Sequence, residues 1–278
     1  MHLIITHKSP DLDASTACWL ITRYLPGWNE AEYGFVPAGE SWEGKDPDID
    51  PQIIHVDTGL GKFDHHNTDA YISASLLVFK YLKKNGHIPD RDLIALERMI
   101  DYVNASDHFF EVSFPEADND RYEFNFSVYI ETVRANFQDD HKILEFMFPN
   151  LDLILQDFKN KVRAEKDISE GFVFQSKFGK CLAVESANEV VVKLAQKKGF
   201  IAVIRKHPIK GYFSIKTLPS PKYNLTPLYE WLVKMDKKAN WYLHPSKNML
   251  LNGSSKKPDM VASQLPINKV VEIMRKME

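Results

Sequence analysis

Cysteine is scarce in this sequence, and long apolar runs are missing. The 278 residues include two cysteines, Cys18 and Cys181, which lie far apart and form no CxxC pair. We therefore expect neither a thiolate zinc site nor a disulfide framework, and the scarcity suits a reducing compartment. The sequence also lacks any run of about 18 apolar residues, the length that a membrane-spanning helix requires. No membrane association is expected.

Signals for export, and for nucleic-acid binding through overall charge, are missing as well. The start, MHLIITHKSPDLD, has no basic segment followed by an apolar one, so we expect a cytoplasmic protein without a secretory signal. Repeats and low-complexity segments are not found. The formal net charge is −3 and hydrophobic residues make up 44% of the chain, as in a soluble globular protein. Contact with nucleic acid would need a local basic patch.

The first half of the chain alternates short apolar segments with amphipathic ones. Apolar segments typical of strands cover 2–6, 31–37 and 52–57, and the helical spacing of apolar residues covers 14–24, 73–85 and 89–105. Helical patterns continue through 119–165, with breaks predicted near 139–140 and 149–150. Asp13 stands where a helix N-cap is expected. This alternation predicts an α/β domain with a parallel sheet covered by helices.

The pattern changes near residue 166. A hairpin is predicted over 172–186, strands over 200–206 and 211–217, and helices over 187–198, 226–236 and 267–277. We therefore expect two domains: an α/β, parallel-sheet catalytic domain over 1–165 and a smaller α+β domain over 166–278 that binds substrate. The active site is expected in the cleft between them.

Side chains that bind metals gather just past the ends of two predicted strands. They are His7, Asp11, Asp13, Asp57, Asp64, His65 and His66. In α/β sheets, binding sites form beyond the carboxyl ends of the strands. Oxygen and imidazole ligands without thiolate suit Mn²⁺ or Mg²⁺, with Zn²⁺, Co²⁺ and Fe²⁺ as alternatives. So many neighbouring carboxylates need compensating positive charge, and two metal ions would supply it.

Each of these residues also has an ordinary structural interpretation. Asp13 alone is most often a helix cap, Asp11 a turn residue and His7 a structural histidine. His55, inside the strand at 52–57, is interpreted as structural. The joint pattern HxxxDxD, D and DHH after two strands is nevertheless hard to obtain from caps and turns alone. We therefore predict one two-metal site that hydrolyses phosphoesters.

The segments HKSPDLDA, VDTG and FDHH resemble the first three motifs of the DHH phosphoesterase superfamily. That superfamily includes single-strand exonucleases, nano-RNases, cyclic-dinucleotide phosphodiesterases and manganese pyrophosphatases. The resemblance implies one ion held by His7, Asp11 and Asp57. It implies a second ion held by Asp13, Asp57, His65 and a fourth-motif aspartate, with Asp57 bridging. His66 would face the substrate phosphate, and the expected catalytic residues are Asp57, Asp64 and His66.

The fourth motif is an aspartate after the helix at 89–105, and the segment IDYVNASDHFF offers two. Asp107 lies beyond Asn104, a plausible helix end, and its surroundings resemble the superfamily pattern better. Asp101 falls in the middle of the predicted helix. We expect Asp107 to be the ligand and keep Asp101 as the alternative.

The second half lacks the glycine-rich GGGH-type motif of the usual superfamily substrate domain. The segments SIKTLPSPKYNLTPLYEWL and YLHPSKNMLLNGSSK instead resemble, in their order, the Myg-type exonuclease branch. Basic and polar residues in this half are the expected substrate anchors, and the Asn252–Ser255 turn could bind a phosphate through its backbone amides. The predicted substrate-binding residues are Arg205, Lys216, His244, Asn252, Gly253 and Ser254.

The expected function is metal-dependent hydrolysis of a nucleotide or short oligonucleotide phosphoester by metal-hydroxide attack, with two Mn²⁺ ions as cofactor. Partners are then a small phosphoester, a nucleotide or a short single-stranded nucleic acid, and a homodimer is compatible with the sequence. A manganese pyrophosphatase-like hydrolase is the alternative. A catalytically silent module that senses nucleotides or metals is the alternative from another class.

Overall fold

The computed structural model describes residues 2–253, 257 and 259–277. The chain divides into two compact units, Met1–Lys159 and Asn160–Glu278. The division falls inside the helix α5 (Asp140–Glu170), and so does the division at 165/166 that we predict from the sequence. The α/β fold class is confirmed, with a parallel sheet in the first unit and a mixed sheet in the second. Among the described residues, no helix has the length and apolar composition to cross a bilayer.

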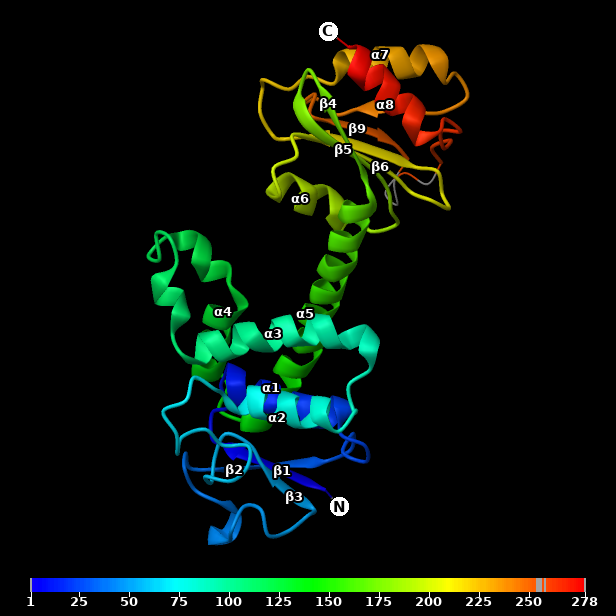
Figure 1. Ribbon diagram of the computed structural model, residues 1–278. Helices are drawn as coiled ribbons and strands as arrows, with labels where there is room; N and C mark the ends of the chain where they lie inside the picture. The colour runs from blue at the N-terminus through cyan, green and yellow to red at the C-terminus, as the bar shows by residue number, and fades with distance from the viewer. Residues whose placement is uncertain (1, 254–256, 258, 278) are drawn as a thin grey trace. The chain divides into compact units, whose positions relative to one another are not determined.

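The sheet of the first unit consists of three parallel strands in the order β2-β1-β3. The strands are β1 (Leu3–His7), β2 (Glu32–Val36) and β3 (Ile53–His55), close to the predicted segments. Ile4, Ile5 and Ile54 are buried, which explains why these short apolar runs form strands in the interior. In Figure 1, the helices α1 (Leu12–Tyr24) and α2 (Ala74–Lys84) cover one face of this sheet.

Further helices complete the first unit. They are α3 (Asp90–Asp107), α4 (Phe126–Asn136) and the start of α5, with three 3-10 turns at Trp42–Gly44, Phe110–Ser113 and Asp120–Phe124. Trp19 and Arg23 of α1 both donate hydrogen bonds to the Asp152 carboxylate of α5, at 2.9–3.1 Å. These bonds join the first helix of the unit to the last.

The predicted helix break near 149–150 is wrong, because α5 continues through Pro149. Proline removes one hydrogen bond from a helix, and here the loss is offset by packing. Ile143, Met147, Leu151 and Leu155 follow one another at four-residue intervals, and all four are buried. This apolar stripe extends on both sides of the proline and keeps the two parts in one helix.

The predicted N-cap of α1 also needs correction. Asp13 lies inside the first turn of the helix, and Asp11 is the cap, with its side chain accepting a hydrogen bond from the amide of Ala14 at 3.0 Å. Pro10 does not prevent this early start, because a proline directly before the N-cap leaves the helical amides intact. Asp13 is therefore free of the capping role that we expected at its own helix.

The second unit contains a six-stranded sheet in the order β4-β5-β6-β7-β9-β8. The strands are β4 (Phe172–Ser176), β5 (Gly179–Glu185), β6 (Ala202–Lys206), β7 (Phe213–Thr217), β8 (Tyr242–Leu243) and β9 (Met249–Asn252). Among these described strands the β5–β6 pair alone is parallel, as expected for two strands joined by a crossover helix, here α6 (Val190–Lys197). The predicted β4–β5 hairpin is present. The β8–β9 pair was not predicted; the sequence analysis gave this segment only substrate-binding residues and the turn that follows it.

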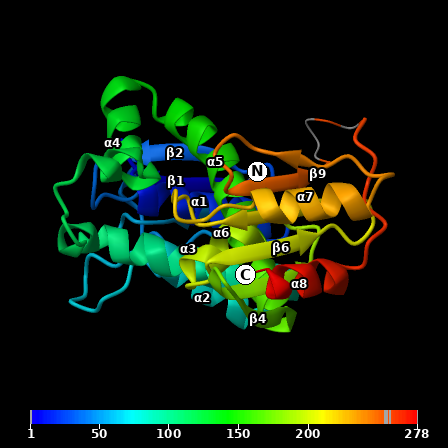
Figure 2. The ribbon, with the colours of Figure 1, turned by 90° about the horizontal axis from the view of Figure 1, so that it is seen from above.

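The two faces of this sheet are covered differently. The helices α7 (Thr226–Met235) and α8 (Ile267–Lys276) lie on one side and α6 on the other (Figure 1), and Figure 2 looks onto the side of α7 and α8. The first side packs on Ile204, Ile215 and Leu250, while α6 packs on residues of β5 and β6 such as Leu182 and Val203. On the side that α6 covers, the part of the sheet formed by β7, β9 and β8 therefore lies outside the apolar cluster under α6.

Gly253 follows β9 in a conformation that only glycine adopts readily, with φ of +85°, and a Cβ at this position would collide with the ring of Tyr212. Gly253→Ala should therefore lower the free energy of unfolding by about 2–4 kcal/mol, through backbone strain and overpacking together. Gly199→Ala is the matched control, because φ is +92° there but a Cβ would meet nothing within 4 Å. It should cost only the strain, about 1 kcal/mol. Urea denaturation of both variants measures the difference, and equal losses would contradict the packing role.

Candidate metal centre

The site forms where β1 and β3 end side by side. The two strands are parallel neighbours with Ile5 opposite His55, and continuing that register places His7 opposite Asp57. Asp57 follows β3 with φ of +55°, the left-handed region that non-glycine residues rarely occupy. This bend turns the Asp57 side chain toward the His7 ring. Backbone strain of this kind is common at functional sites.

The two carboxylate oxygens of Asp57 face two different histidines. Oδ2 lies 3.3 Å from Nε2 of His7, and Oδ1 lies 3.2 Å from Nε2 of His65. The side chain of Asp57 is 3% exposed, so water cannot separate these groups freely. A carboxylate with one oxygen directed at each of two ligand sets has the arrangement that a bridging metal ligand requires.

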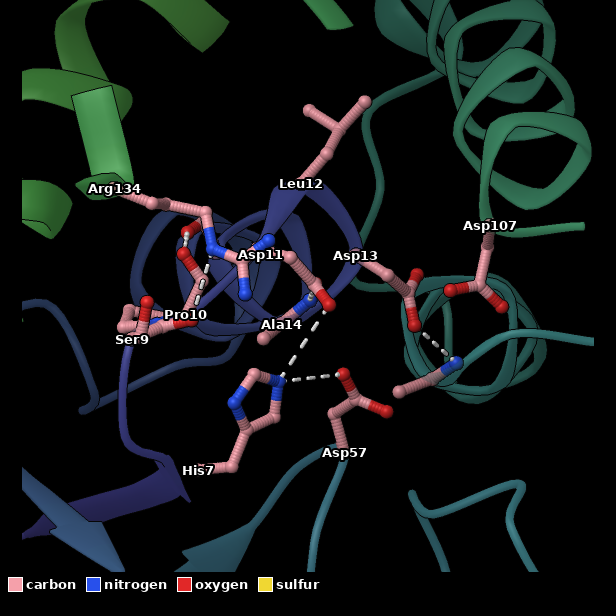
Figure 3. Close-up of polar contacts among 12 residues, drawn as sticks. His7, Ser9, Pro10, Asp11, Leu12, Asp13, Ala14, Asp57, Asp107 and Arg134 are labelled. Atoms are coloured by element: carbon pink, nitrogen blue, oxygen red, sulfur yellow. Dashed lines mark hydrogen bonds and ion pairs between the residues drawn. The ribbon is translucent and has the colours of Figure 1, made fainter. Parts of the chain in front are cut away.

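Two groups of side chains share this centre. His7, Asp11 and Asp57 place one ligand atom each within 4.8 Å of one another, and so do Asp13, His65 and Asp107. Figure 3 shows His7 directed at both Asp11 and Asp57, with the carboxylates of Asp13 and Asp107 directed toward each other. The first group is the first ligand set that the resemblance implies, and the second group contains that implied second set apart from Asp57. A third group consists of Asp57, His65 and His66.

The ionisable groups of the centre strongly shift one another's pKa values. Burial acts to raise the pKa of Asp57, but its contacts with His65 and His7 outweigh burial and hold that pKa well below its ordinary value. Burial acts to lower the pKa of His7, yet Asp57 and Asp11 raise it to about 9. Asp57 likewise raises the pKa of His65 to about 9. Burial, reinforced by Asp57 and Asp107, raises the pKa of Asp13 to about 8.

These shifts show that the carboxylates are short of positive charge. Burial also raises the pKa values of Asp11 and Asp107. Oδ1 of Asp57 is buried, and its contact with Nε2 of His65 at 3.2 Å does not form a well-aligned hydrogen bond. A buried carboxylate oxygen without a well-formed hydrogen bond costs free energy unless a cation binds it. The donor set of carboxylates and imidazoles, without thiolate, fits a hard or borderline divalent metal ion.

The surroundings of His7 select the nitrogen that faces the centre. Nδ1 of His7 lies 2.8 Å from the carbonyl oxygen of Lys8, so it carries the proton and donates. Nε2 is then the free nitrogen, and it points at Asp11 and Asp57. A backbone carbonyl on the second ring nitrogen is the usual way in which proteins orient a metal-binding histidine.

Asp64 and His66 form a pair at the edge of the centre. Oδ1 of Asp64 lies 2.7 Å from Nδ1 of His66, and Oδ2 accepts from the amide of Leu60 at 2.7 Å. The side chain of His66 is 57% exposed, in contrast to the 15% of His65. Asp64 therefore orients His66 and shapes the loop, and this pairing leaves Nε2 of His66 for other partners.

Asp13 performs two tasks. Its oxygens accept hydrogen bonds from the amides of Ala74 and Ser75, the start of α2, at 2.7 and 3.0 Å. A carboxylate at a helix N-terminus is stabilised by the unpaired amides there. The cap we predicted within its own helix is thus a cap on a neighbouring one. The remaining lone pairs of the same carboxylate lie in the group with His65 and Asp107.

The fourth aspartate is Asp107 by position. Oδ2 of Asp107 lies 3.7 Å from Nε2 of His65, and its side chain is 17% exposed. Asp107 is the last residue of α3, whereas Asp101 is an exposed residue within that helix. Of the two aspartates left open by the sequence, only Asp107 is near the ligands. His55 agrees with its structural interpretation: Nε2 accepts from the amide of Trp42, and Nδ1 lies 3.1 Å from the carbonyl of Pro47.

A cation beside the centre escaped the sequence analysis. Arg134 of α4 donates through Nε to the carbonyl of Ser9 at 3.0 Å and pairs with Glu131 at 2.8 Å. Its charge acts on the Asp11 carboxylate, and Figure 3 shows its guanidinium group over that residue. A lone arginine in an amphipathic helix gives no sequence signal, because its proximity to the first motif arises only from helix packing.

Comparisons with known proteins give distant structural matches. No family model matches the chain, and no curated protein matches it. The pGpG-specific phosphodiesterase PggH from Vibrio is 15% identical over 98% of each chain, with a TM-score of 0.29. An uncharacterized protein from Helicobacter pylori is 13% identical over 99% of each chain, with a TM-score of 0.30.

A further match is the DHH domain of a protein that belongs to a family of ribosomal proteins. It is 11% identical over 99% of this chain and 86% of that chain, with a TM-score of 0.31. TM-scores this low carry no argument by themselves. The decisive observation is local: the three motifs, far apart in the sequence, place their ligands together at one edge of a parallel sheet. This grouping is the one that the resemblance of the three motifs to the DHH superfamily implies.

The substrate residues predicted in the second unit differ in their surroundings. Arg205 is 6% exposed, and it donates to the carbonyl of Ser186 at 3.0 Å. Asn252 is fully buried, with its amide bonded to the backbone of Asn240, Val261 and Ser263. These contacts stabilise the unit and argue against a role in substrate binding.

The turn after β9 gives no support to the predicted phosphate site. Gly253 is explained by the close approach of Tyr212. Ser254 lies outside the described residues. The phosphate-binding turn therefore stays a prediction, with a structural reason for its glycine.

Lys216 and His244 remain available to a ligand. Lys216 pairs with Met249, whose carbonyl accepts from the amide of His244, so all three side chains lie on one face of the sheet. That face is the α6 side, at the end beyond the apolar cluster. Both side chains are partly exposed, and Nδ1 of His244 lies 2.8 Å from the hydroxyl of Ser246.

The roles of Asp57 and His66 can be separated by substitution. Asp57→Asn should weaken the binding of both ions, since one oxygen serves each ligand set. His66→Ala should leave metal content near that of the wild type and slow turnover by about 10²–10³-fold. Metal analysis after equilibration with Mn²⁺, together with a rate measurement, tests both. Loss of the ions in His66→Ala would show that His66 is a ligand, as its place in the third group allows.

The pH dependence of stability follows from the histidines. A histidine whose pKa rises from 6.5 to about 9 on folding stabilises the protein below pH 6.5, and this contribution is lost as pH rises through 9. Asp13, raised from 3.8 to about 8, changes stability with the same sign. The metal-free protein should therefore lose stability between pH 6.5 and 9.

Metal ions should reverse this trend, because they bind the deprotonated ligands. The difference in melting temperature between protein with excess Mg²⁺ or Mn²⁺ and protein with EDTA should widen as pH rises through this range. His65→Gln should flatten the decline in EDTA, whereas His87→Gln, a substitution outside the ligand groups, should not. A metal-free stability that is constant between pH 6.5 and 9 would rule out the coupling.

Proposed function

We propose that the protein is a divalent-metal-dependent phosphoesterase of the DHH type that hydrolyses a nucleotide or a short oligonucleotide. One observation carries the proposal: the buried Asp57 directs one oxygen toward each of two imidazoles, within two three-residue ligand groups. Such a pair of sets suits two ions rather than one. A catalytically silent module has no need for both sets, so the complete ligand set favours an enzyme.

The ligand sets divide by position. His7, Asp11 and Asp57 would hold one ion, and the second would be held by Asp13, Asp57, His65 and Asp107. When bound, two such ions neutralise phosphoryl oxygens and lower the pKa of bound water. Manganese as the native metal stays a prediction, and so do the cytoplasmic location and a homodimer.

The remaining site residues act on the substrate or on each other. His66 is exposed beside the ligands and donates from Nδ1 to Asp64, so Nε2 faces away from that pair. When the ring carries a proton on both nitrogens, Nε2 can donate to a phosphoryl oxygen or to the leaving oxygen. Asp64 is a positioning residue. Arg134 holds the carbonyl of Ser9 and thereby fixes the loop between His7 and Asp11.

The second unit has ligand-binding candidates of its own. Lys216 and His244 share an open part of its sheet face and are the proposed residues for binding a phosphate in that unit. Similar structures include a pGpG-specific phosphodiesterase and an exopolyphosphatase-related protein from Bacteroides fragilis, so both a nucleotide and an inorganic chain of phosphates belong in a test.

The proposal predicts hydrolysis that requires a divalent ion. Pyrophosphate, linear dinucleotides, cyclic dinucleotides, 3′,5′-bisphosphates and short RNA should be assayed with Mn²⁺, with Mg²⁺ and with EDTA. At least one nucleotide should be cleaved with metal and none with EDTA, and Asp57→Asn should lower the rate by at least about 10²-fold. Cleavage of pyrophosphate alone would favour the pyrophosphatase-like alternative. If metal binds but no substrate is cleaved, the result would favour the catalytically silent sensing module.

A further inference from the structure

A cavity of about 350 Å³ opens beside the metal ligands of the first unit. One wall consists of Asp11, Asp13 and Asp107, and the other belongs to α4, including Ser127 and Arg134. The volume lies within the range of small-molecule sites, near its lower end. A ligand in this cavity would touch the centre directly.

Phe109 lines the same cavity from the position just past His108, the C-cap of α3. Its φ of +55° is the left-handed conformation in which helices commonly end, but glycine or asparagine is usual there and a bulky side chain is rare. Its ring is 71% exposed, so packing does not compensate for the strain. The next residue, Phe110, packs against Tyr102 with 5.4 Å between ring centroids. The chain thus has a packed aromatic at 110 and presents a second one at 109.

A second exposed aromatic lies on the neighbouring rim of the centre. Tyr71 is 61% exposed, and its ring lies against the tilted ring of His108, with 4.0 Å between centroids and 37° between the ring planes. The His108 ring in turn lies 6.5 Å from that of His65. Exposed flat rings next to a phosphate-binding metal centre are the surfaces on which nucleobases stack.

The charged residues of the cavity indicate where the phosphate and the apolar part of a ligand would bind. Arg134 is the cationic residue among its described lining residues, and it is held in place by Ser9 and Glu131. The other charged lining residues are carboxylates, Glu111 and Glu131 among them, so phosphate oxygens would bind at metal ions held by the ligand wall and beside Arg134. Phe109, which has no charge or hydrogen-bonding group, suits the flat apolar part of the same molecule.

We propose that Phe109 is the stacking surface for a nucleobase of the substrate, so that this cavity takes a nucleoside phosphate in preference to an inorganic phosphate chain. The inference rests on the proposed function, because it names the substrate class of that site. It assigns to one residue the discrimination between nucleotides and other phosphoesters.

The kinetic test compares two substrates that differ only in a base. One is a 5′-phosphorylated adenine dinucleotide, and the other carries abasic tetrahydrofuran residues on the same backbone. The KM of the wild type should be about tenfold lower for the adenine substrate, the ratio that 1.4 kcal/mol of stacking gives. In Phe109→Asn this preference should disappear.

The variants are chosen so that folding does not confuse the result. Asparagine tolerates the left-handed region, so Phe109→Asn should melt at or above the wild-type temperature. Phe109→Trp should keep the preference for adenine. Phe124→Ala removes an aromatic ring that is 94% exposed and outside the cavity lining, and it should leave both KM values unchanged.

Binding distinguishes failure of this inference from failure of the proposed function. Calorimetry with Mn²⁺ should show AMP binding about tenfold tighter than ribose 5-phosphate, and Phe109→Asn should remove the difference. If no nucleotide of the substrate panel is cleaved with Mn²⁺ or Mg²⁺, the proposed function fails, while the AMP preference still decides the role of Phe109. Equal binding of the two ligands by the wild type, or an AMP preference that survives in Phe109→Asn, would overturn the inference.

Discussion

Repulsion among buried carboxylates is the constraint on which the rest of the site depends. Asp13 and Asp57 are almost fully buried, and Asp11 and Asp107 adjoin them. Such charges coexist in a water-poor site only beside positive charge or after protonation. The chain supplies two imidazoles to Asp57, two helix amides to Asp13, and one amide and the charge of Arg134 to Asp11, yet the pKa values of Asp11, Asp13 and Asp107 stay raised. The negative charge that these groups leave uncompensated makes the centre suited to divalent cations.

Backbone strain also occurs in the ligand-bearing segments. Ser9, Asp57 and Phe109 have φ values of 53°, 55° and 55°, and each lies next to or within such a segment. Strained conformations persist only where neighbouring interactions hold them. The amide of Ser9 donates to Asp140, and its carbonyl accepts from Arg134. The helices α4 and α5 therefore hold the first motif in shape without providing a ligand.

The elements were predictable from the sequence wherever local pattern and final packing agree. The three strands of the first unit and the β4–β5 hairpin follow apolar periodicity, and burial of the apolar side chains stabilises them. Local rules failed where tertiary contacts outweighed them. Pro149 indicates a break, but the buried stripe that passes through it keeps one helix. The short strands of the β8–β9 pair, at 242–252, lack apolar alternation strong enough to predict, and pairing with β7 stabilises them.

The sequence by itself determined the chemistry of the ligands: oxygen and imidazole donors, close to the ends of two strands, without thiolate. Those properties reside in residue type and local order. Only the tertiary structure decided between Asp107 and Asp101, brought Arg134 and Phe109 beside the ligands, and buried Arg205 and Asn252 among backbone partners. The reason is that these distances are set by how α3, α4 and the second sheet pack, and packing joins residues whose separation in sequence carries no periodic signal.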